Sequence, residues 1–486
     1  MKDLISVRDL AKEDIFEILR MADSYKEMDP TTFPTTQGRI ASLFFENSTR
    51  TRVSSETAAS SLGFSVNGFT GVEGTSVKKG EPLIDTVRMF QGYDYDAIVM
   101  RHNLAGAARL AADYLKIPVI NGGDGSSSHP TQTLLDLYSI NEAKGGIDGL
   151  NIALVGDLKY GRTVHSLLQA LELFNSTVYL ISPPNLAMPE WRIRDYEKTG
   201  KVVVVEHDLA KVLGVIDILY VTRIQRERFA EGVEGESEFK KVSNTFRITK
   251  KFLDKYASKD RDLKVLHPLP RDKNYIELHP DVDNTSYAYY FQQARNGLFV
   301  RQAIFELMID DELLGRERNK KIPPNLQELP INNDNKNREK FIYRLDDGTL
   351  IDHIEPNQGR RICEMLGLDQ LGEVVLCMNI NSGKFNKKDV LAIHHQYLTS
   401  DQLYKLALIS PKHTINIIKD RKIVNKQRAM LPSPLEDFIT CSNPLCISRP
   451  EHNEFVKSIF YVESQDPLEL RCHYCEQLYQ QNELEF

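Results

Sequence analysis

Residues 150–166, LNIALVGDLKYGRTVHS, run from an apolar strand through a glycine turn into a helical pattern. The same change from strand to helix recurs along about the first 310 residues, where each strand is apolar almost throughout. Such strands are typical of parallel sheets, because helices cover both faces of the sheet. The pattern therefore predicts an α/β fold with two doubly wound parallel-sheet domains. The other apolar runs are residues 39–46, 95–101, 117–122, 177–182, 201–206, 215–223 and 262–270.

Changes in pattern predict where the chain divides. A helix that begins near His129 and ends at Gly145-Gly146 separates two series of strands, so a boundary is expected near residues 135–148. After about residue 337, strands and helices follow in the order of a ferredoxin-like α+β domain. The predicted divisions are residues 1–135 (completed by returning helices at about 291–315), 136–290, a polar linker at 316–337, 338–435 and 436–486.

Composition describes an ordinary protein with no bias toward polyanions. Hydrophobic residues make up 41% of the 486, charged residues 27%, and the net charge is -7. Charges interrupt the apolar residues of the N-terminus, which indicates an amphipathic helix and not a signal peptide. No segment approaches the ~18 consecutive apolar residues of a membrane span. We therefore expect a cytoplasmic protein without nucleic-acid or membrane partners.

Four of the six cysteines crowd into the last fifty residues. In a reducing cytosol this clustering favours a metal over disulfides. Two pairs of thiolates suit a tetrahedral zinc ion with a closed shell, so we expect one structural zinc per chain in a small zinc-ribbon-like β domain. Cys363 and Cys377 are expected to be buried core thiols. The predicted metal ligands are Cys441, Cys446, Cys472 and Cys475.

Arginines follow several of the apolar strands. Arg101 and Arg223 come directly after a strand, Arg162 follows a glycine turn, and Arg50 lies where a strand meets a helix. The carboxyl ends of parallel strands face the crevice where such folds bind ligands. No catalytic carboxylate pair, serine triad, metal-ligand cluster or G-x-G-x-x-G spacing is present in this half. The sequence thus predicts a site for anionic substrates that works by positioning and charge stabilisation.

Each motif also has a plainer interpretation. The string S-T-R-T at residues 48–51 is more often a helix cap with a solvated arginine. A lone histidine before proline, as at His129, is more often a loop residue than a catalyst. A lysine in a loop, such as Lys78 or Lys79, is usually solvated. These alternatives stay open for each motif taken alone.

Five motifs taken in order give the chain a specific resemblance. S-T-R-T, H-P-T-Q, G-D-L-K-Y-G-R-T-V-H-S, T-R-I-Q-R-E-R and H-P-L-P-R resemble the catalytic chain of the aspartate carbamoyltransferase family over residues 1 to about 310. Residues 338–486 resemble the regulatory chain of the same enzyme through T-L-I-D-H-I, N-S-G, N-K-Q-R and the four cysteines. The resemblance implies transfer of a carbamoyl group from carbamoyl phosphate to L-aspartate, giving N-carbamoyl-L-aspartate and phosphate for pyrimidine synthesis, in a chain with a fused regulatory region.

The resemblance also implies a role for each residue of the motifs. A phosphate cradle would consist of Ser48, Thr49, Arg50 and Thr51. The carbonyl oxygen would be held by Thr51, Arg101 and His129, and the carbamoyl amide would be oriented by Gln132 and the carbonyls of Leu269 and Pro270. Both carboxylates of aspartate would bind Arg162, Arg223 and Gln225. Glu46 would pair with Arg162 or Arg228 across the closed domains.

In the family a neighbouring subunit completes the site, which here implies Ser76 and Lys79 and an assembly built on trimers. The loop is one residue shorter than in the best-known relatives, which favours Lys79 over Lys78. The resemblance places nucleoside triphosphates near Asp352, His353, Lys388, Asn416 and Lys426. A family lysine aligns with Ala392, which weakens the expectation of nucleotide binding because phosphate recognition is mainly electrostatic.

Two rival functions remain to be weighed. Ornithine carbamoyltransferase would share the phosphate loop, but Leu269 stands where an acidic or thiol partner for an amine is expected, and Arg223 favours a dicarboxylate. The other rival is a nucleotide-sensing or nucleic-acid-binding scaffold with a decayed catalytic half. The intact set of arginines argues against it, because clustered charges are costly without a ligand.

Overall fold

The computed structural model describes residues 3–225, 229, 237, 239, 242, 246–273, 277–309, 325–331, 345–368, 373–383 and 386–484. The chain divides into two compact units. The first is Met1–Arg318 with Asn443–Val456 and Tyr474–Glu476, and the second is Asn319–Ser442 with Lys457–His473 and Gln477–Phe486. Among the described residues, no helix combines the length and apolar character needed to cross a membrane.

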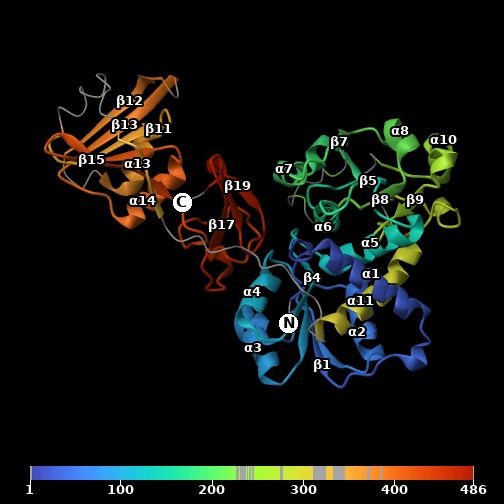
Figure 1. The fold of residues 1–486 in the computed structure, drawn as a ribbon. Helices are drawn as coiled ribbons and strands as arrows, with labels where there is room; N and C mark the ends of the chain where they lie inside the picture. The colour runs from blue at the N-terminus through green and yellow to red at the C-terminus, as the bar shows by residue number, and fades with distance from the viewer. Residues whose placement is uncertain are drawn as a thin grey trace. The chain divides into compact units, whose positions relative to one another are not determined.

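The first unit contains a parallel sheet of four strands, of which Figure 1 labels β1 and β4. The strand order is β2-β1-β3-β4. The order reverses between β1 and β3, so a crevice opens beyond the carboxyl ends of these two strands. The strands are β1 (Arg39–Phe44), β2 (Ser65–Thr70), β3 (Ala97–His102) and β4 (Val119–Asp124). The helices around them are α1 (Lys12–Glu27), α2 (Arg50–Ser61), α3 (Leu83–Gly92) and α4 (Ala107–Tyr114).

A second parallel sheet in the same unit has five strands in the order β7-β6-β5-β8-β9. Its order reverses between β5 and β8. Two doubly wound parallel sheets are therefore present, which confirms the predicted fold of this half. The strands are β5 (Asn151–Val155), β6 (Thr177–Ile181), β7 (Val203–Glu206), β8 (Ile218–Val221) and β9 (Lys264–Leu266). The helices are α6 (Arg162–Leu171), α7 (Glu190–Glu197), α8 (Leu209–Val212) and α10 (Lys250–Tyr256).

Helix α5 (Pro130–Lys144) links the two sheets. His129 is its N-cap, and it ends at Gly145, whose φ of 71° is the left-handed conformation that favours glycine at a helix end. Most residues of α5 are buried, as expected for a helix packed on all sides. Helix α11 (Tyr290–Ile309) returns from the second sheet to pack against α1, α2 and α5. One apolar cluster includes residues of both sheets, such as Ile40 and Ile152.

The second unit contains a six-stranded antiparallel sheet in the order β10-β15-β14-β11-β13-β12. From β11 to β14 the elements follow the predicted β-α-β-β-α-β sequence. Of the predicted linker 316–337, only 325–331 lie within the described residues, and they include the edge strand β10. The elements are β10 (Asn325–Glu328), β11 (Gly348–Ile354), α13 (Gly359–Leu366), β12 (Val374–Ser382), β13 (Asn386–His394), α14 (Ser400–Ile409), β14 (Thr414–Lys419) and β15 (Lys422–Met430).

A four-stranded antiparallel sheet, in the order β16-β17-β18-β19, forms the small C-terminal β region. Its strands are β16 (Leu435–Glu436), β17 (Ile459–Gln465), β18 (Leu468–Cys472) and β19 (Leu478–Gln480). The expectation of buried core thiols at Cys363 and Cys377 is wrong, because both are half-buried. Cys377 lies on the sheet-edge strand β12, and Cys363 borders the buried face of α13.

Two segments from the C-terminal region, residues 443–456 and 474–476, belong to the first unit. The Ala105 N–H donates to the Leu445 carbonyl at 2.8 Å. The Ser6 hydroxyl donates to a Glu476 carboxylate oxygen at 2.9 Å. Backbone pairing and a buried polar contact thus join these segments to the first unit.

Candidate active site

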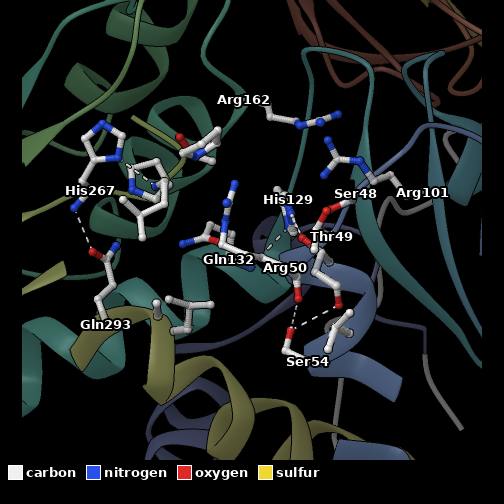
Figure 2. Close-up of a pocket in the computed structure, with 18 of the residues that line it drawn as sticks. Ser48, Thr49, Arg50, Ser54, Arg101, His129, Gln132, Arg162, His267 and Gln293 are labelled. Atoms are coloured by element: carbon white, nitrogen blue, oxygen red, sulfur yellow. Dashed lines mark hydrogen bonds between the residues drawn. The ribbon is translucent and has the colours of Figure 1, made fainter. Parts of the chain in front are cut away.

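A pocket of about 930 Å³ lies in the first unit, lined by residues at or just after the carboxyl ends of β1, β3, β5 and β8 (Figure 2). These are the strands at which both sheets reverse their order, where ligands bind in open α/β folds. Twelve of the predicted catalytic and substrate residues line it: Ser48, Thr49, Arg50, Thr51, Arg101, His129, Gln132, Arg162, Arg223, Gln225, Leu269 and Pro270.

The start of helix α2 suits an anion. Thr49 is the N-cap, and no side chain caps the first turn, so the N-terminal N–H groups and the helix dipole are available at the pocket wall. The pKa of Arg50 is lowered, first by burial and then by the positive charge of Arg223. An anion placed near both guanidinium groups would relieve this repulsion.

Glu46 holds two of the arginines. Its carboxylate lies 2.8 Å from Arg101 and 3.0 Å from Arg162. Burial disfavours its ionised form, but the two guanidinium groups outweigh burial and lower its pKa to about 2. The Glu46–Arg162 pair implied by the resemblance is therefore confirmed, while the alternative partner Arg228 lies outside the described residues.

His129 is set up as a neutral donor. Its Nδ1 lies 3.3 Å from the Gln132 N–H, and acceptance of that hydrogen bond assigns the proton to Nε2. Nε2 lies 3.4 Å from the Thr51 hydroxyl at the pocket. Burial, followed by the charges of Arg101 and Arg162, holds the pKa of His129 well below its usual value. The ring can thus donate to a carbonyl oxygen without carrying a charge.

The turn after β9 is held by its own histidine. The Leu269 N–H donates to His267 Nδ1 at 2.8 Å, and the His267 N–H donates to Gln293 Oε1 at 2.8 Å. Leu269 has a φ of 55°, in the left-handed region that non-glycine residues rarely adopt. These two hydrogen bonds fix the conformation of the turn that carries Leu269 and Pro270.

Sequence reasoning missed several residues that line the pocket: Thr163, Thr222, His267, Gln293, Arg295 and Arg301. Three of them belong to α11, which is far from the motifs in sequence. The polar run Q-Q-A-R-N at residues 292–296 was the available signal, because a helix in the core of a domain seldom carries so many polar groups without partners.

Ser76 and Lys79 do not line this pocket. They form a short 3-10 helix, Ser76–Lys79, and both side chains are exposed. Lys78, the alternative weighed from the sequence, lies 2.8 Å from Glu73. Ser76 and Lys79 are therefore exposed on the chain surface and contribute nothing to the pocket of their own chain.

The residues predicted for nucleotide binding lie on the second unit's large sheet. Ala392, Leu350, Asn416 and Lys426 are successive partners across β13, β11, β14 and β15, so their side chains share one face. Asn416 Oδ1 is buried without a hydrogen-bond partner, and Lys426 donates to the Pro330 carbonyl at 3.3 Å.

Asp352 connects the two remaining residues of this predicted nucleotide set. Its carboxylate lies 2.5 Å from Lys388 and 3.4 Å from His353. The lysine that would contact a phosphate is thus already paired with an acid.

The four clustered cysteines, Cys441, Cys446, Cys472 and Cys475, are buried, and their sulfur atoms all lie within 4.8 Å of one another. A tetrahedral zinc ion with Zn–S bonds of about 2.3 Å would set sulfur atoms roughly 3.8 Å apart. The spacing therefore fits a structural metal ion after a small contraction. Four thiolates would leave no coordination position for a substrate, so the metal would stabilise the fold and take no part in chemistry.

Four known domains, two from a catalytic chain and two from a regulatory chain, match successive parts of the sequence. Residues 2–142 match "Aspartate/ornithine carbamoyltransferase, carbamoyl-P binding domain", and residues 148–308 match the Asp/Orn binding domain of the same family. Residues 341–430 match the allosteric domain of the aspartate carbamoyltransferase regulatory chain, and residues 433–485 match its metal binding domain.

Individual relatives match the first two-thirds of the chain. The aspartate carbamoyltransferase catalytic subunit of Thermococcus kodakarensis is 48% identical over 311 residues, 63% of this chain and 97% of the relative. The solved catalytic subunit of M. jannaschii aspartate transcarbamoylase is 45% identical with a TM-score of 0.58, covering 64% of this chain and 99% of that chain. The Trypanosoma cruzi enzyme in complex with carbamoyl phosphate and aspartate is 36% identical with a TM-score of 0.57, covering 63% and 95%.

Removal of the metal is expected to destabilise the C-terminal β region. Cys441→Ser should lower the metal content from one ion per chain to near zero and lower the melting temperature, because metal binding and folding are coupled in such sites. Elemental analysis and thermal unfolding with and without a chelator measure both effects. Cys377→Ser is the matched control and should keep the metal. Unchanged metal content and melting in Cys441→Ser would contradict a structural metal site.

Proposed function

The chain belongs to the aspartate carbamoyltransferase family, whose members transfer the carbamoyl group of carbamoyl phosphate to L-aspartate for pyrimidine synthesis, and we propose how its residues carry out this reaction. The supporting observation is one pocket at the reversal points of two sheets, lined by Arg50, Arg101, Arg162 and Arg223 around the neutral His129. Both substrates are anions, and this pocket offers them fixed cations and neutral donors.

The phosphate of carbamoyl phosphate binds at the start of α2. Backbone N–H groups and the hydroxyls of Ser48, Thr49 and Thr51 contact its oxygens, and Arg50 adds a bidentate fork. This placement is supported by the uncapped first turn of α2 and by the repulsion between Arg50 and Arg223 that an anion would relieve.

The carbonyl oxygen of carbamoyl phosphate contacts Thr51, Arg101 and the His129 Nε2–H. As the amine attacks, negative charge grows on this oxygen, and fixed donors stabilise it without having to reorient. The C–N bond forms, the C–O bond to phosphate breaks with its electron pair leaving on the phosphate, and the departing phosphate takes the one proton that the amine gives up. No covalent intermediate with the protein is needed, since the residues act by charge and position.

Aspartate binds through its two carboxylates to Arg162, Arg223 and Gln225. The contacts of Arg162 with Glu46 and with the Gly125 carbonyl support this assignment, because they hold its guanidinium group at the pocket. Arginine forks match carboxylates and would leave the amine of ornithine unpaired. Leu269 likewise offers no acidic or thiol group to a second amine, so aspartate is favoured over ornithine.

The four-cysteine site binds zinc, one ion per chain. A shell of four thiolates and the sulfur spacing both support zinc over harder cations, which prefer oxygen ligands.

We assign domains in line with these roles. Residues 1–135, with the returning helix at about 291–315, bind carbamoyl phosphate, and residues 136–290 bind aspartate. A linker at 316–337 connects these two domains to the rest of the chain. The nucleotide-binding-like domain is residues 338–435, and the zinc-binding domain is residues 436–486. The single reversal point of each parallel sheet supports one substrate per catalytic domain.

The active oligomer is built on trimers in which Ser76 and Lys79 reach the phosphate of a neighbouring chain. Their exposure, and their position outside this chain's own pocket, support a site shared between chains. A cyclic arrangement lets every chain give the same residues to the next.

Nucleoside triphosphates bind the face of the second unit's sheet that carries Asn416 and Lys426. The unpartnered Asn416 Oδ1 supports recognition of a base, because a buried acceptor gains from an amino group. Lys388 and His353 lie beside Asp352 at the same end of the sheet and complete the set.

Arg50→Ala is expected to lower kcat/KM for carbamoyl aspartate formation by roughly 10²–10³-fold or more, because a fixed charge on the departing phosphate is lost. The melting temperature should change little, since Arg50 is largely solvent-accessible although the pocket partly desolvates its guanidinium group. Production of carbamoyl aspartate from carbamoyl phosphate and aspartate measures the effect. Arg52→Ala, which removes a neighbouring arginine that does not line the pocket, is the control. Full activity in Arg50→Ala would refute the phosphate assignment.

Coexpressed Arg50→Ala and Lys79→Ala chains should recover activity that each lacks alone. In random trimers about a quarter of the sites pair an intact pocket with an intact neighbouring lysine, so about a quarter of wild-type activity is expected. Coexpression of Arg50→Ala with Arg101→Ala is the control and should stay inactive, because both residues belong to one chain's pocket. Recovery equal to this control would show that the site is not shared.

Ala392→Lys is expected to tighten binding of ATP or CTP several-fold, because the new ammonium would lie in the same row as Asn416 and Lys426. Gln427→Lys is the matched control, since it adds the same charge on the opposite face of β15. Calorimetric titration measures both variants. Equal affinities of Ala392→Lys and Gln427→Lys for nucleotide would contradict this location of the site.

A further inference from the structure

Three hydrogen bonds converge on the buried carboxylate of Asp136, one turn after Gln132 on α5. Asp136 Oδ1 accepts from Gln132 Nε2 at 2.8 Å and from Gln293 Nε2 at 2.7 Å. Asp136 Oδ2 accepts from the Tyr220 hydroxyl at 2.8 Å. These donors come from α5, α11 and β8, so a single acid joins three separate elements.

The contact with Asp136 decides which end of the Gln132 amide faces the pocket. A carboxylate accepts hydrogen bonds and cannot donate them, so it holds the NH₂ group of Gln132. The Gln132 side chain is one of those that line the pocket (Figure 2). Because its NH₂ group donates to Asp136, Oε1 is the atom left to accept from a ligand. A free acceptor recognises an N–H donor, as on a carbamoyl group, and has nothing to bind on a methyl group.

The same acid reaches the turn that carries Leu269 and Pro270. Gln293 donates to Asp136 with its Nε2. Its Oε1 accepts a hydrogen bond from the backbone N–H of His267, which is the dashed line between His267 and Gln293 in Figure 2. Because both ends of the Gln293 amide are used, its orientation is fixed as well. Asp136 thus fixes both groups that are predicted to accept from the carbamoyl amide, namely Gln132 and the turn at Leu269 and Pro270.

Asp136 acts as a pure acceptor above neutral pH, where its carboxyl group is ionised. Burial raises its pKa to about 7, although the three hydrogen bonds and the charge of Arg301 oppose this rise. Tyr220, the other titratable group in contact, keeps its proton because burial and then the Asp136 charge raise its pKa. Above pH 8 the carboxylate is therefore mostly ionised and accepts all three bonds.

We infer that Asp136 is a positioning and specificity-determining residue, which orients Gln132 and the turn at Leu269 so that the pocket accepts a carbamoyl group and rejects an acetyl group. This inference rests on the proposed function of the pocket. Asp136 does not line the pocket, so it acts through Gln132 and Gln293. The arginines recognise the phosphate group of carbamoyl phosphate and of acetyl phosphate alike. The oriented Gln132 amide distinguishes the carbamoyl group from the acetyl group.

The test uses acetyl phosphate as a competitor of carbamoyl phosphate in the full-length protein at pH 8.5. The discrimination ratio is the inhibition constant of acetyl phosphate divided by the KM of carbamoyl phosphate. Asp136→Ala should lower this ratio roughly tenfold, because the Gln132 amide can then turn its NH₂ group to the pocket. Asp136→Asn should lower it by an intermediate, few-fold amount, since its amide oxygen still accepts but carries no charge.

A double-mutant cycle separates orientation from general damage. In a Gln132→Ala background, Asp136→Ala and Asp136→Asn should lower the ratio much less than in the wild-type background, because only the route through Gln293 and the Leu269 turn remains. Asp217→Asn is the matched control: Asp217 is a buried acid that accepts from the Asn151 N–H at 2.9 Å and does not line the pocket. Its ratio should equal that of the wild type.

Each outcome decides the inference. A wild-type ratio in Asp136→Ala, or in Asp136→Asn if the alanine variant does not fold, overturns it. An equal fall of the ratio in the Gln132→Ala background also overturns it, since the effect would then not pass through Gln132. If the wild-type protein forms no carbamoyl aspartate, the proposed function fails instead, so the two failures are distinguishable.

Discussion

Repulsion among arginines gathered around one pocket is the constraint on which the rest of this structure depends. Burial and then the charge of Arg223 lower the pKa of Arg50, and burial followed by the charges of Arg101 and Arg162 keeps His129 neutral. Such an arrangement is costly unless acids or ligands balance it. Glu46 supplies part of the balance, and anionic substrates would supply the remainder. The same charges that oppose folding therefore favour binding.

The two sheets explain how one pocket can gather these charges. In a parallel sheet all carboxyl ends lie at one edge, and the reversal of strand order opens a crevice there. Arg101 lies at the carboxyl end of β3 of the first sheet, and Arg223 follows β8 of the second. Helix α5 and the returning helix α11 pack together and bring the two crevices into one pocket. The apolar strands thus determine where the polar residues meet.

Much of this arrangement could be predicted from local sequence. Apolar strands, the cap at His129 and the glycine at Gly145 each act within a few residues, so their pattern identifies the elements and the arginines that follow them. The parts that escaped prediction depend on contacts between distant segments. Gln293 and Arg301 reach the pocket because α11 returns to the first sheet, which no local pattern records. Cys363 and Cys377 were expected to be buried from their apolar neighbours, but Cys363 borders the buried face of α13, and Cys377 lies on the edge strand β12, which has a neighbouring strand on one side alone.

Charge and neutral hydrogen bonds have different roles in this pocket. Guanidinium groups attract any phosphate or dicarboxylate, so they contribute strongly to rate and weakly to the choice between a carbamoyl and an acetyl group. Neutral amides discriminate between donors and acceptors, provided that their orientation is fixed. A free glutamine side chain can present either end of its amide, whereas one held by a carboxylate presents its oxygen. Burial makes the Asp136 carboxyl group costly to ionise. Its carboxylate nevertheless fixes the Gln132 amide, so that the pocket distinguishes a carbamoyl group from an acetyl group, which the arginines do not.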